Sequence, residues 1–195
     1  PGFDPNAKIH LLQGLRDRFE AAGPNHLWDR EGRWNIPHPQ PHTWRTEHTA
    51  QARPEEALRQ SLAYQTRLWT GSAPVEVPLL SGSAFLVRRA AFEAIGGFDE
   101  RYFLYFEEND FFERFRRGGY HAAVVPEARF FHFHEPRRHP GQDERYQASK
   151  ELYERTWFPP AGPARAPLPP SAAPPPMEPL RWDAPLSVDG RTVLY

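Results

Sequence analysis

The stretch of residues 79–135 constrains the fold of this chain more than any other part of the sequence. It holds an acidic run at positions 107–110, a row of aromatic residues and a closing His-Phe-His. The flanking segments carry fewer chemically informative residues. Short β-type and helical patterns follow one another along it, divided by glycine pairs. We therefore expect an α/β fold, in which a mixed sheet forms the core and helices pack around it.

The composition excludes several classes of protein. A net charge of −1 over 195 residues leaves no electrostatic footprint for nucleic acid or for an anionic membrane surface. Cysteine is absent, which excludes disulfides and thiolate metal sites and fits a reducing, cytoplasmic setting. No apolar run approaches the roughly 20 residues of a membrane span, and no signal peptide is visible. We expect a cytoplasmic protein with no nucleic-acid partner.

Upstream of the stretch, the sequence predicts two helices. Apolar residues recur at helical spacing over residues 5–21, and Gly23 with Pro24 is expected to end that helix. A second helix is expected over residues 54–69, with one side marked by Leu58, Leu62, Gln65 and Leu68. Between them, residues 27–49 show no period and are predicted to form an irregular surface excursion. Its three tryptophans are expected to be anchors or sugar-stacking faces: Trp28, Trp34 and Trp44.

The first half of the stretch reads as strand and then helix. Residues 75–87 have β character, interrupted at Pro78 and at the Ser-Gly-Ser of positions 81–83. A glycine inside a strand pattern marks a bulge or a close approach of the backbone to a ligand. Residues 89–95 are predicted to form a short helix that ends at a glycine pair in the left-handed conformation.

The second half of the stretch predicts a helix and two strands. The helix begins at residue 109 or 110 and ends at 117, with three aromatic side chains facing inward: Phe111, Phe112 and Phe115. Short strands are expected at residues 121–125 and 129–134, separated by a Pro-Glu turn. A last helix is expected over residues 143–157.

The 23 prolines are unevenly spread and divide the chain into three parts. Residues 1–158 are expected to belong to one globular domain. Residues 159–181 are rich in proline and alanine and are predicted to be a semi-rigid, extended linker. Residues 182–195 hold an Asp-Gly turn and a β-like Thr-Val-Leu-Tyr. A strand there needs partners, so we expect this piece to be a tail or the start of a further segment.

The acidic run Glu107, Glu108, Asn109 and Asp110 has two interpretations. Acidic residues at a helix N-terminus interact favourably with the unpaired N–H groups and the helix dipole, by about 0.3–1 kcal/mol each. The alternative is a general base at a pocket rim, where a carboxylate takes a proton from an attacking hydroxyl. Mutual repulsion among three carboxylates raises the pKa of at least one of them, which suits a base.

His132 and His134 are two residues apart, so on a strand both imidazoles face the same side. Such histidines are most often structural and partly buried, and the alternative is a metal site. With hard oxygen ligands elsewhere, an imidazole suits Mn²⁺ or Mg²⁺ rather than a structural zinc. The aromatic residues at positions 102–106 are more often core than a sugar platform.

Taken together and in order, these motifs resemble one family. The segment SGSAFLVRRAAFEAIGGFDERYFLYFEENDFFERFRRGGYHAAVVPEARFFHFH has a Ser-Gly-small element before a strand, a Gly-Gly-Phe-Asp-Glu turn and an acidic motif that opens a helix. A Gly-Tyr strand, a Pro-Glu-Ala turn and a terminal His follow. This order resembles the C-terminal half of a family 2 glycosyltransferase with the GT-A fold. The closest subgroup is the bacterial rhamnosyltransferase-like enzymes of polysaccharide and O-antigen assembly.

The resemblance implies catalytic roles for three acidic residues. Glu108 falls where the family has its catalytic base, usually an Asp, and Glu107 comes just before it. Glutamate keeps the carboxylate on a longer arm. Asp110 matches the second acid of the motif, which starts the helix or orients the acceptor.

The resemblance also implies metal and substrate contacts. His132 matches the histidine that binds the divalent metal in many GT-A enzymes, and His134 lies outside the usual pattern. Ser81 and Gly82 are implied to line the floor near the donor sugar. Asp99, in the Gly-Gly-Phe-Asp-Glu turn, is a further substrate-binding candidate.

One departure from the family is large. The first half of these enzymes carries a Rossmann-like nucleotide-binding unit and an Asp-x-Asp metal motif, and neither occurs in this sequence. We therefore expect a partial Rossmann-like sheet, with the N-terminal nucleotide-binding half absent from this chain and the fragment inactive alone. The intact protein is expected to transfer a sugar, with inversion, from a nucleotide-sugar donor to a hydroxyl of a saccharide or lipid-linked saccharide. Mn²⁺ or Mg²⁺ would assist, and peripheral attachment at the cytoplasmic face of the inner membrane is compatible with this role.

Two other classes of function stay open. One is a non-catalytic carbohydrate-binding or assembly module on the same fold, with the tryptophans stacking on sugars. The other is a metal-dependent hydrolase that uses His132, His134 and a carboxylate.

Overall fold

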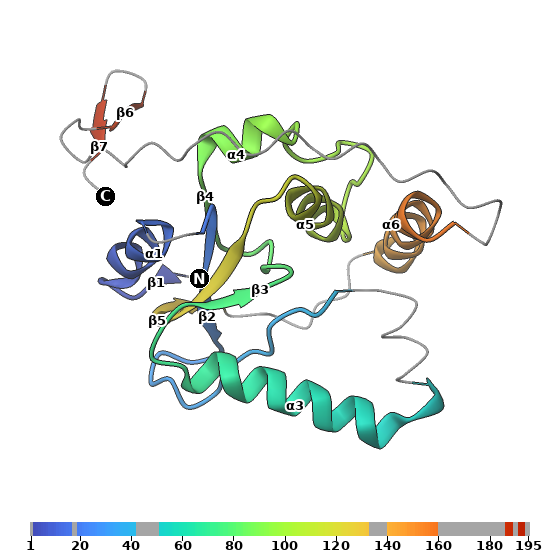
Figure 1. Cartoon of the computed structure of the whole chain (residues 1–195), viewed down its shortest axis with the longest axis horizontal. Helices are drawn as coiled ribbons and strands as arrows, with labels where there is room; N and C mark the ends of the chain where they lie inside the picture. The colour runs from blue at the N-terminus through green and yellow to red at the C-terminus, as the bar shows by residue number, and fades with distance from the viewer. Residues whose placement is uncertain are drawn as a thin grey trace.

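The computed structural model describes residues 2–16, 19–41, 51–132 and 140–159, together with two short strands at 186–188 and 191–193 (Figure 1). The predicted linker at 159–181 lies outside these residues apart from Pro159, as do Trp44 and His134. No helix in the described part of the chain is long and apolar enough to cross a bilayer.

One long strand organises a five-stranded mixed sheet (Figure 1). This strand, β5 (Ala122–Phe131), pairs in parallel with β2 (Ala21–Leu27), and β2 pairs antiparallel with β4 (Leu86–Val87). The other edge of β5 is shared by β1 (Gly2–Phe3) and β3 (Val75–Val77), which pair antiparallel with its C-terminal and N-terminal ends. The expected mixed sheet at the centre of an α/β fold is confirmed.

Helices cover both faces of this sheet. α1 (Ala7–Arg16) lies on one face, where its apolar residues pack against Ala22, Val125 and Ala128 (Figure 1). The opposite face carries α4 (Arg89–Ala94) and α5 (Glu107–Arg117). The two helices and the sheet enclose the larger of the two cores. Its buried residues outside α4 and α5 are Ala21, Leu68, Val77, Leu79, Leu80, Tyr120, Ala122 and Val124. Neighbouring residues such as Val124 and Val125 serve different cores because side chains alternate across a strand.

Two further helices flank the core. α3 (Pro54–Thr70) matches its prediction in length, but only half of its predicted apolar side is buried. Gln65 and Leu68 face inward, whereas Leu58 and Leu62 are 61% and 55% exposed. α6 (Gln142–Trp157) also matches its prediction and packs beyond α5, on the side away from the sheet (Figure 1).

The prediction that a helix runs over residues 5–21 and stops at Gly23 and Pro24 is wrong. α1 ends at Arg16, and both residues lie inside β2, which is buried along its whole length. A strand covered on both faces lacks the polar–apolar alternation that reveals strands in sequence. Gly23 is needed for packing, because a Cβ atom there would come within 2.7 Å of the Leu80 side chain.

The two strands predicted at 121–125 and 129–134 are one strand. The register of β2 and β5 shifts between Pro24 and Asn25, so the predicted turn at Pro126 is a bulge inside β5. Asn25 stabilises the bulge, since its side-chain amide donates to the carbonyl of Pro126 at 3.0 Å and to that of Leu68 at 3.4 Å. The bulge shifts the pairing of β2 with β5, and both strands continue beyond it.

The remaining elements agree with the sequence pattern more closely. α5 begins two to three residues earlier than predicted, at Glu107, and its three phenylalanines are buried as expected. Gly96 and Gly97 follow α4 with φ of 80° and 68°, the predicted left-handed stop. At the C-terminal end, β7 (Arg191–Val193) has a partner within the chain, β6 (Leu186–Val188).

Candidate functional site

The predicted base and the predicted substrate loop meet in the structure. Glu108 lies in the first turn of α5, and Gly82 lies in the loop between β3 and β4. A Cβ atom at Gly82 would lie 3.7 Å from the carboxyl carbon of Glu108 and 3.9 Å from its Oε1. The carboxyl group of Glu108 therefore lies close to the backbone of Gly82, with no side chain of that residue between them.

The environment of Glu108 makes its carboxyl group a stronger base. Burial raises the pKa of Glu108, a hydrogen bond from its own backbone N–H lowers it, and the charge of Glu107 raises it further. The sequence predicted that repulsion between carboxylates raises this pKa. In the structure, burial raises the pKa of Glu108 more than the charge of Glu107 does. Oε2 of Glu108 and Oε2 of Glu107 are buried without a hydrogen bond from any described residue.

Asp110 makes contacts that join two helices. The residue is 1% exposed, and its carboxylate forms an ion pair with Arg114, at 2.8 Å between Nη2 and Oδ2. The indole Nε1 of Trp157, in α6, donates to the other oxygen, Oδ1, at 3.0 Å. Both oxygens are thus occupied by side chains of α5 and α6.

The turn that leads into α5 has an unusual backbone. Tyr105 and Phe106 have φ of 69° and 64°, in the left-handed region that residues with side chains rarely adopt. α6 holds this turn from several sides. Ser149 donates to the carbonyl of Leu104 at 2.8 Å, Gln142 donates to the Tyr105 hydroxyl, and the Phe106 ring packs on Tyr153. Strained conformations of this kind persist only where the surrounding structure enforces them, and they cluster at functional sites.

Asp99 lies in a different environment from Glu108. Its carboxylate binds the guanidinium of Arg101 at 2.5 Å, which holds the pKa of Asp99 below its usual value. Its backbone carbonyl accepts from Tyr102 N–H at 3.1 Å. These contacts order the turn after α4.

Histidines gather where the parallel strands end. His26 is near the end of β2 and His132 directly follows β5, with ring centroids 6.4 Å apart. The ring of His38 lies 5.9 Å from that of His26. In open α/β sheets, ligands bind outside the carboxyl ends of parallel strands. The site therefore includes His26 and His38, which the sequence analysis missed because no motif or period marks them.

Hydrogen bonds link His26 to the loop that contains Ser81, Gly82 and Ser83. Its Nε2 is 2.8 Å from Oγ of Ser83, which is in turn 2.8 Å from Oγ of Ser81. Burial, helped by the nearby His38 and His132, lowers the pKa of His26 to about 4, against a smaller rise from the backbone of Pro24. The ring is therefore neutral at physiological pH.

His38 is fixed by a second set of partners. Its Nε2 lies 2.8 Å from Oδ1 of Asn25, and its backbone exchanges two hydrogen bonds with the amide of Gln65. Because the Asn25 amide nitrogen donates to backbone carbonyls, Oδ1 is the acceptor and His38 Nε2 carries the proton. Burial lowers the pKa of His38 to about 4.

The described residues do not complete a metal site. Nowhere in the described ranges do three His, Asp or Glu side chains come together as a metal would require. His132 directly follows β5, and its predicted companion His134 falls outside those ranges.

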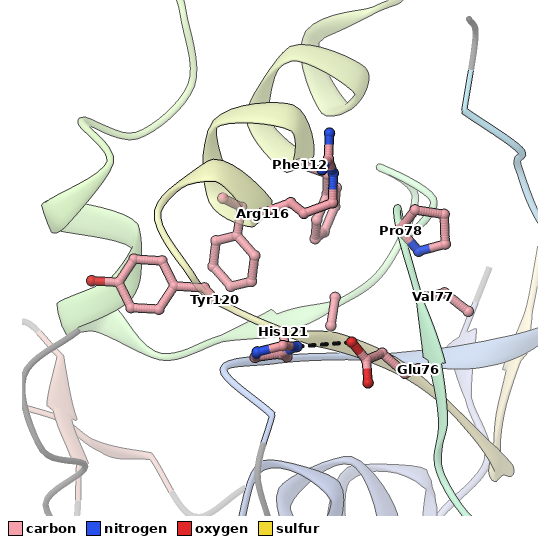
Figure 2. A pocket seen from close by; sticks show the side chains of 9 residues that line it. Glu76, Val77, Pro78, Phe112, Arg116, Tyr120 and His121 are labelled. Atoms are coloured by element: carbon pink, nitrogen blue, oxygen red, sulfur yellow. Dashed lines mark hydrogen bonds and ion pairs between the residues drawn. The ribbon is translucent and has the colours of Figure 1, made fainter. Parts of the chain in front are cut away.

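A separate cavity of about 380 Å³ opens at the other end of α5 (Figure 2). Its floor is aromatic and its rim is charged, with His121 and Glu76 joined at 2.8 Å. It is lined by Glu76, Val77, Pro78, Phe112, Phe115, Arg116, Tyr120, His121 and Ala122. None of the predicted site residues lines it, so the candidate site remains the one around Glu108.

Comparison with known proteins supports a relationship to glycosyltransferases. The chain is similar to an N-acetylglucosaminyl-diphospho-decaprenol L-rhamnosyltransferase, found in two strains of Mycobacterium tuberculosis, with 49% identity over 61 residues. This match covers 30% of the chain and 20% of each relative, so only about a fifth of the relatives' length is represented. No family model matches the chain.

Proposed function

We propose that the protein containing this chain is an inverting glycosyltransferase of family 2 with the GT-A fold. The observation that carries the proposal is the half-buried carboxyl of Glu108, with a raised pKa, close to the backbone of Gly82. Partial identity with a rhamnosyltransferase supports the same class of reaction. In this proposal residues 1–158 form the acceptor-side half of the enzyme.

Glu108 acts as the general base. An acceptor hydroxyl approaches over Gly82, and its oxygen attacks the anomeric carbon of the donor sugar. As the new C–O bond forms, the hydroxyl proton passes to the carboxylate. The bond between the anomeric carbon and the diphosphate oxygen breaks, and the nucleoside diphosphate leaves with the electron pair. A raised pKa increases the proton affinity of the carboxylate and so helps this transfer.

The other predicted residues have supporting roles. Asp110 is a positioning residue, because it anchors the first turn of α5 to α6 through Trp157. Ser81 and Gly82 contact the substrate. Asp99 orders the turn after α4 through Arg101, and any substrate contact it makes comes from that turn.

The proposed reaction uses a divalent cation, a sugar donor and a sugar acceptor. His132 would contribute an imidazole to Mn²⁺ or Mg²⁺, which would stabilise the departing diphosphate when bound. The donor is a nucleotide sugar, and the acceptor is a saccharide or lipid-linked saccharide. The relatives are named for an N-acetylglucosaminyl-diphospho-lipid acceptor, which is the first acceptor to test. We place the protein in the cytoplasm, with access to the cytoplasmic face of the inner membrane.

The test is transfer by the full-length protein. Nucleotide-sugar donors are supplied with this acceptor, and product is measured for the wild type, Glu108→Gln and Glu113→Gln. Glu113 is a matched control because it lies on the same helix and pairs with Arg116 and Arg117. We expect Glu108→Gln to bind nucleotide normally and to lose about 10²–10⁴-fold in kcat. Full activity in Glu108→Gln would exclude this base.

The carbohydrate-binding alternative has one observation in its favour. Trp28 and Trp34 are 45% and 66% exposed, and their backbones are joined by a hydrogen bond of 2.9 Å. Exposed aromatic faces are suited to stacking on sugar rings. Saccharide binding that Trp34→Ala abolishes, in a protein that binds no nucleotide, would favour this alternative over transfer.

A further inference from the structure

The aromatic residues around the turn before α5 divide into buried and exposed ones. Tyr102 and Phe106 are each 5% exposed and belong to a small core that they share with Tyr153 of α6. Phe103 is 77% exposed, and Tyr146 on α6 is 45% exposed. From the sequence alone, the aromatic series at 102–106 could be core or a sugar platform. In the structure two of its members are core, whereas Phe103 and Tyr146 are accessible to a ligand.

Contacts between the turn and α6 hold the two exposed rings in position. The guanidinium of Arg145 lies over the Phe103 ring, 5.0 Å from its centroid. The Tyr146 ring packs against the rings of Tyr105 and Phe106, with a centroid separation of 5.4 Å in each pair. Side chains that are already ordered lose little conformational entropy when a ligand stacks on them. The exposed rings are therefore prepared for binding.

Phe103, Tyr146 and the half-buried Tyr105 form an aromatic patch that borders the proposed base. Three peptide bonds separate Tyr105 from Glu108, so their Cα atoms are at most about 11 Å apart. A short saccharide spans such a distance. A sugar ring that lies on the aromatic patch can thus belong to the same molecule whose hydroxyl is deprotonated by Glu108.

The charges beside the aromatic patch favour a saccharide over an anionic lipid surface. Asp143 and Glu144 are exposed in the first turn of α6, next to Arg145 and Tyr146 in the sequence. Carboxylates accept hydrogen bonds from sugar hydroxyls, and they repel anionic headgroups. The apolar face of a sugar ring packs on aromatic rings, whereas its hydroxyls need polar partners. This part of the molecule offers both kinds of group.

We propose that Phe103, Tyr105 and Tyr146 form a stacking subsite for the acceptor saccharide beside Glu108. A sugar ring of the acceptor lies on the aromatic patch, and exposed carboxylates of α6 accept hydrogen bonds from its hydroxyls. The inference rests on the proposed transfer reaction and adds the residues that determine which acceptor is used.

Kinetics of the full-length protein test this subsite. We expect Phe103→Ala and Tyr146→Ala each to raise the acceptor KM about tenfold and to leave the donor KM unchanged, because each removes one stacking face. Phe103→Tyr keeps an aromatic face and should recover most of the loss. Leu58→Ala is the control, since it removes an apolar side chain that is 61% exposed on another helix, α3. Thermal unfolding of each variant distinguishes a lost contact from misfolding.

Equilibrium binding gives a readout that does not need transfer. Saturation-transfer NMR with N-acetylglucosamine, in the absence of donor, should show binding to the wild type and weaker binding to both alanine variants. No transfer by the wild type with any donor would overturn the proposed function. Transfer with an unchanged acceptor KM in both variants would overturn the inference alone. So would variants that lose binding to vesicles of anionic phospholipid and keep that of the saccharide, because the aromatic patch would then be a membrane contact.

Discussion

The pKa of Glu108 leads to a prediction about the pH dependence of transfer. A general base works only when deprotonated, so kcat/KM should fall as pH drops through the pKa of Glu108. Because the charge of Glu107 helps to raise that pKa, Glu107→Gln should move the acid limb to lower pH. The measurement is the pH profile of kcat/KM for both proteins. An acid limb that stays in place, or moves to higher pH, would contradict the assignment of Glu108 as base.

Gly82 permits a second test at the level of one atom. A methyl group there would make ordinary contacts of 3.7–3.9 Å with Glu108, so Gly82→Ala should fold with unchanged thermal stability. The methyl group would nevertheless cover the carboxyl where the acceptor is proposed to approach. We expect kcat to fall about 10–100-fold, because small misplacements of reacting groups are costly. Steady-state kinetics beside thermal unfolding distinguishes this result from misfolding.

At the scale of elements, α6 holds the start of α5 in place. Trp157→Phe keeps the ring but removes the N–H that reaches Oδ1 of Asp110, which leaves one oxygen of a buried carboxylate unpaired. We expect a loss of about 1–3 kcal/mol in the free energy of unfolding. Denaturant unfolding measures it, with Arg155→Gln, at an exposed position of the same helix, as the control. Equal stability of the two variants would show that this hydrogen bond contributes nothing.

The elements also show which parts of the fold were predictable. α4, α5 and α6 were found because each combines an apolar period with glycine or charged residues at its ends, and these are local signals. β2 was missed because glycine and proline usually end a helix or strand. Here Gly23 lies where the Leu80 side chain packs closely, and Pro24 lies where the register with β5 shifts. Neither the close packing nor the bulge can be predicted from the sequence without knowing which residues lie opposite β2.

The candidate site was predictable to a similar extent. Glu108 and Gly82 were identified through motif order, and the structure adds the contact between them. His26 carries no motif, and its role depends on Ser83, far away in sequence and brought near only when β2 pairs with β4. A residue inside a local motif, such as Glu108, can be identified from the sequence. A residue whose partner is distant in the sequence, such as His26, cannot.

At the scale of the whole molecule, two buried histidines make stability depend on pH. Unfolded, His26 and His38 have the ordinary pKa of 6.5, whereas folded the pKa of each is about 4. As pH falls below 6.5 the unfolded chain takes up protons that the folded chain does not, so stability decreases. The loss grows until about pH 4 and reaches roughly 3 kcal/mol per histidine. Urea unfolding at pH 7.5 and 5 measures it, and His38→Gln should flatten the dependence. An equally steep dependence in that variant would exclude His38 as a cause.

The position of β5 has a consequence for how the chain folds during synthesis. β1, β2 and β3 all pair with β5 and all precede it, and Asn25 meets Pro126 across 101 residues. Contacts so distant in sequence form slowly, because a long loop must close before they contribute. Among the described strands, only β2 and β4 can pair before β5 leaves the ribosome. β1, β2 and β3 therefore wait for one late strand before most of their backbone pairs.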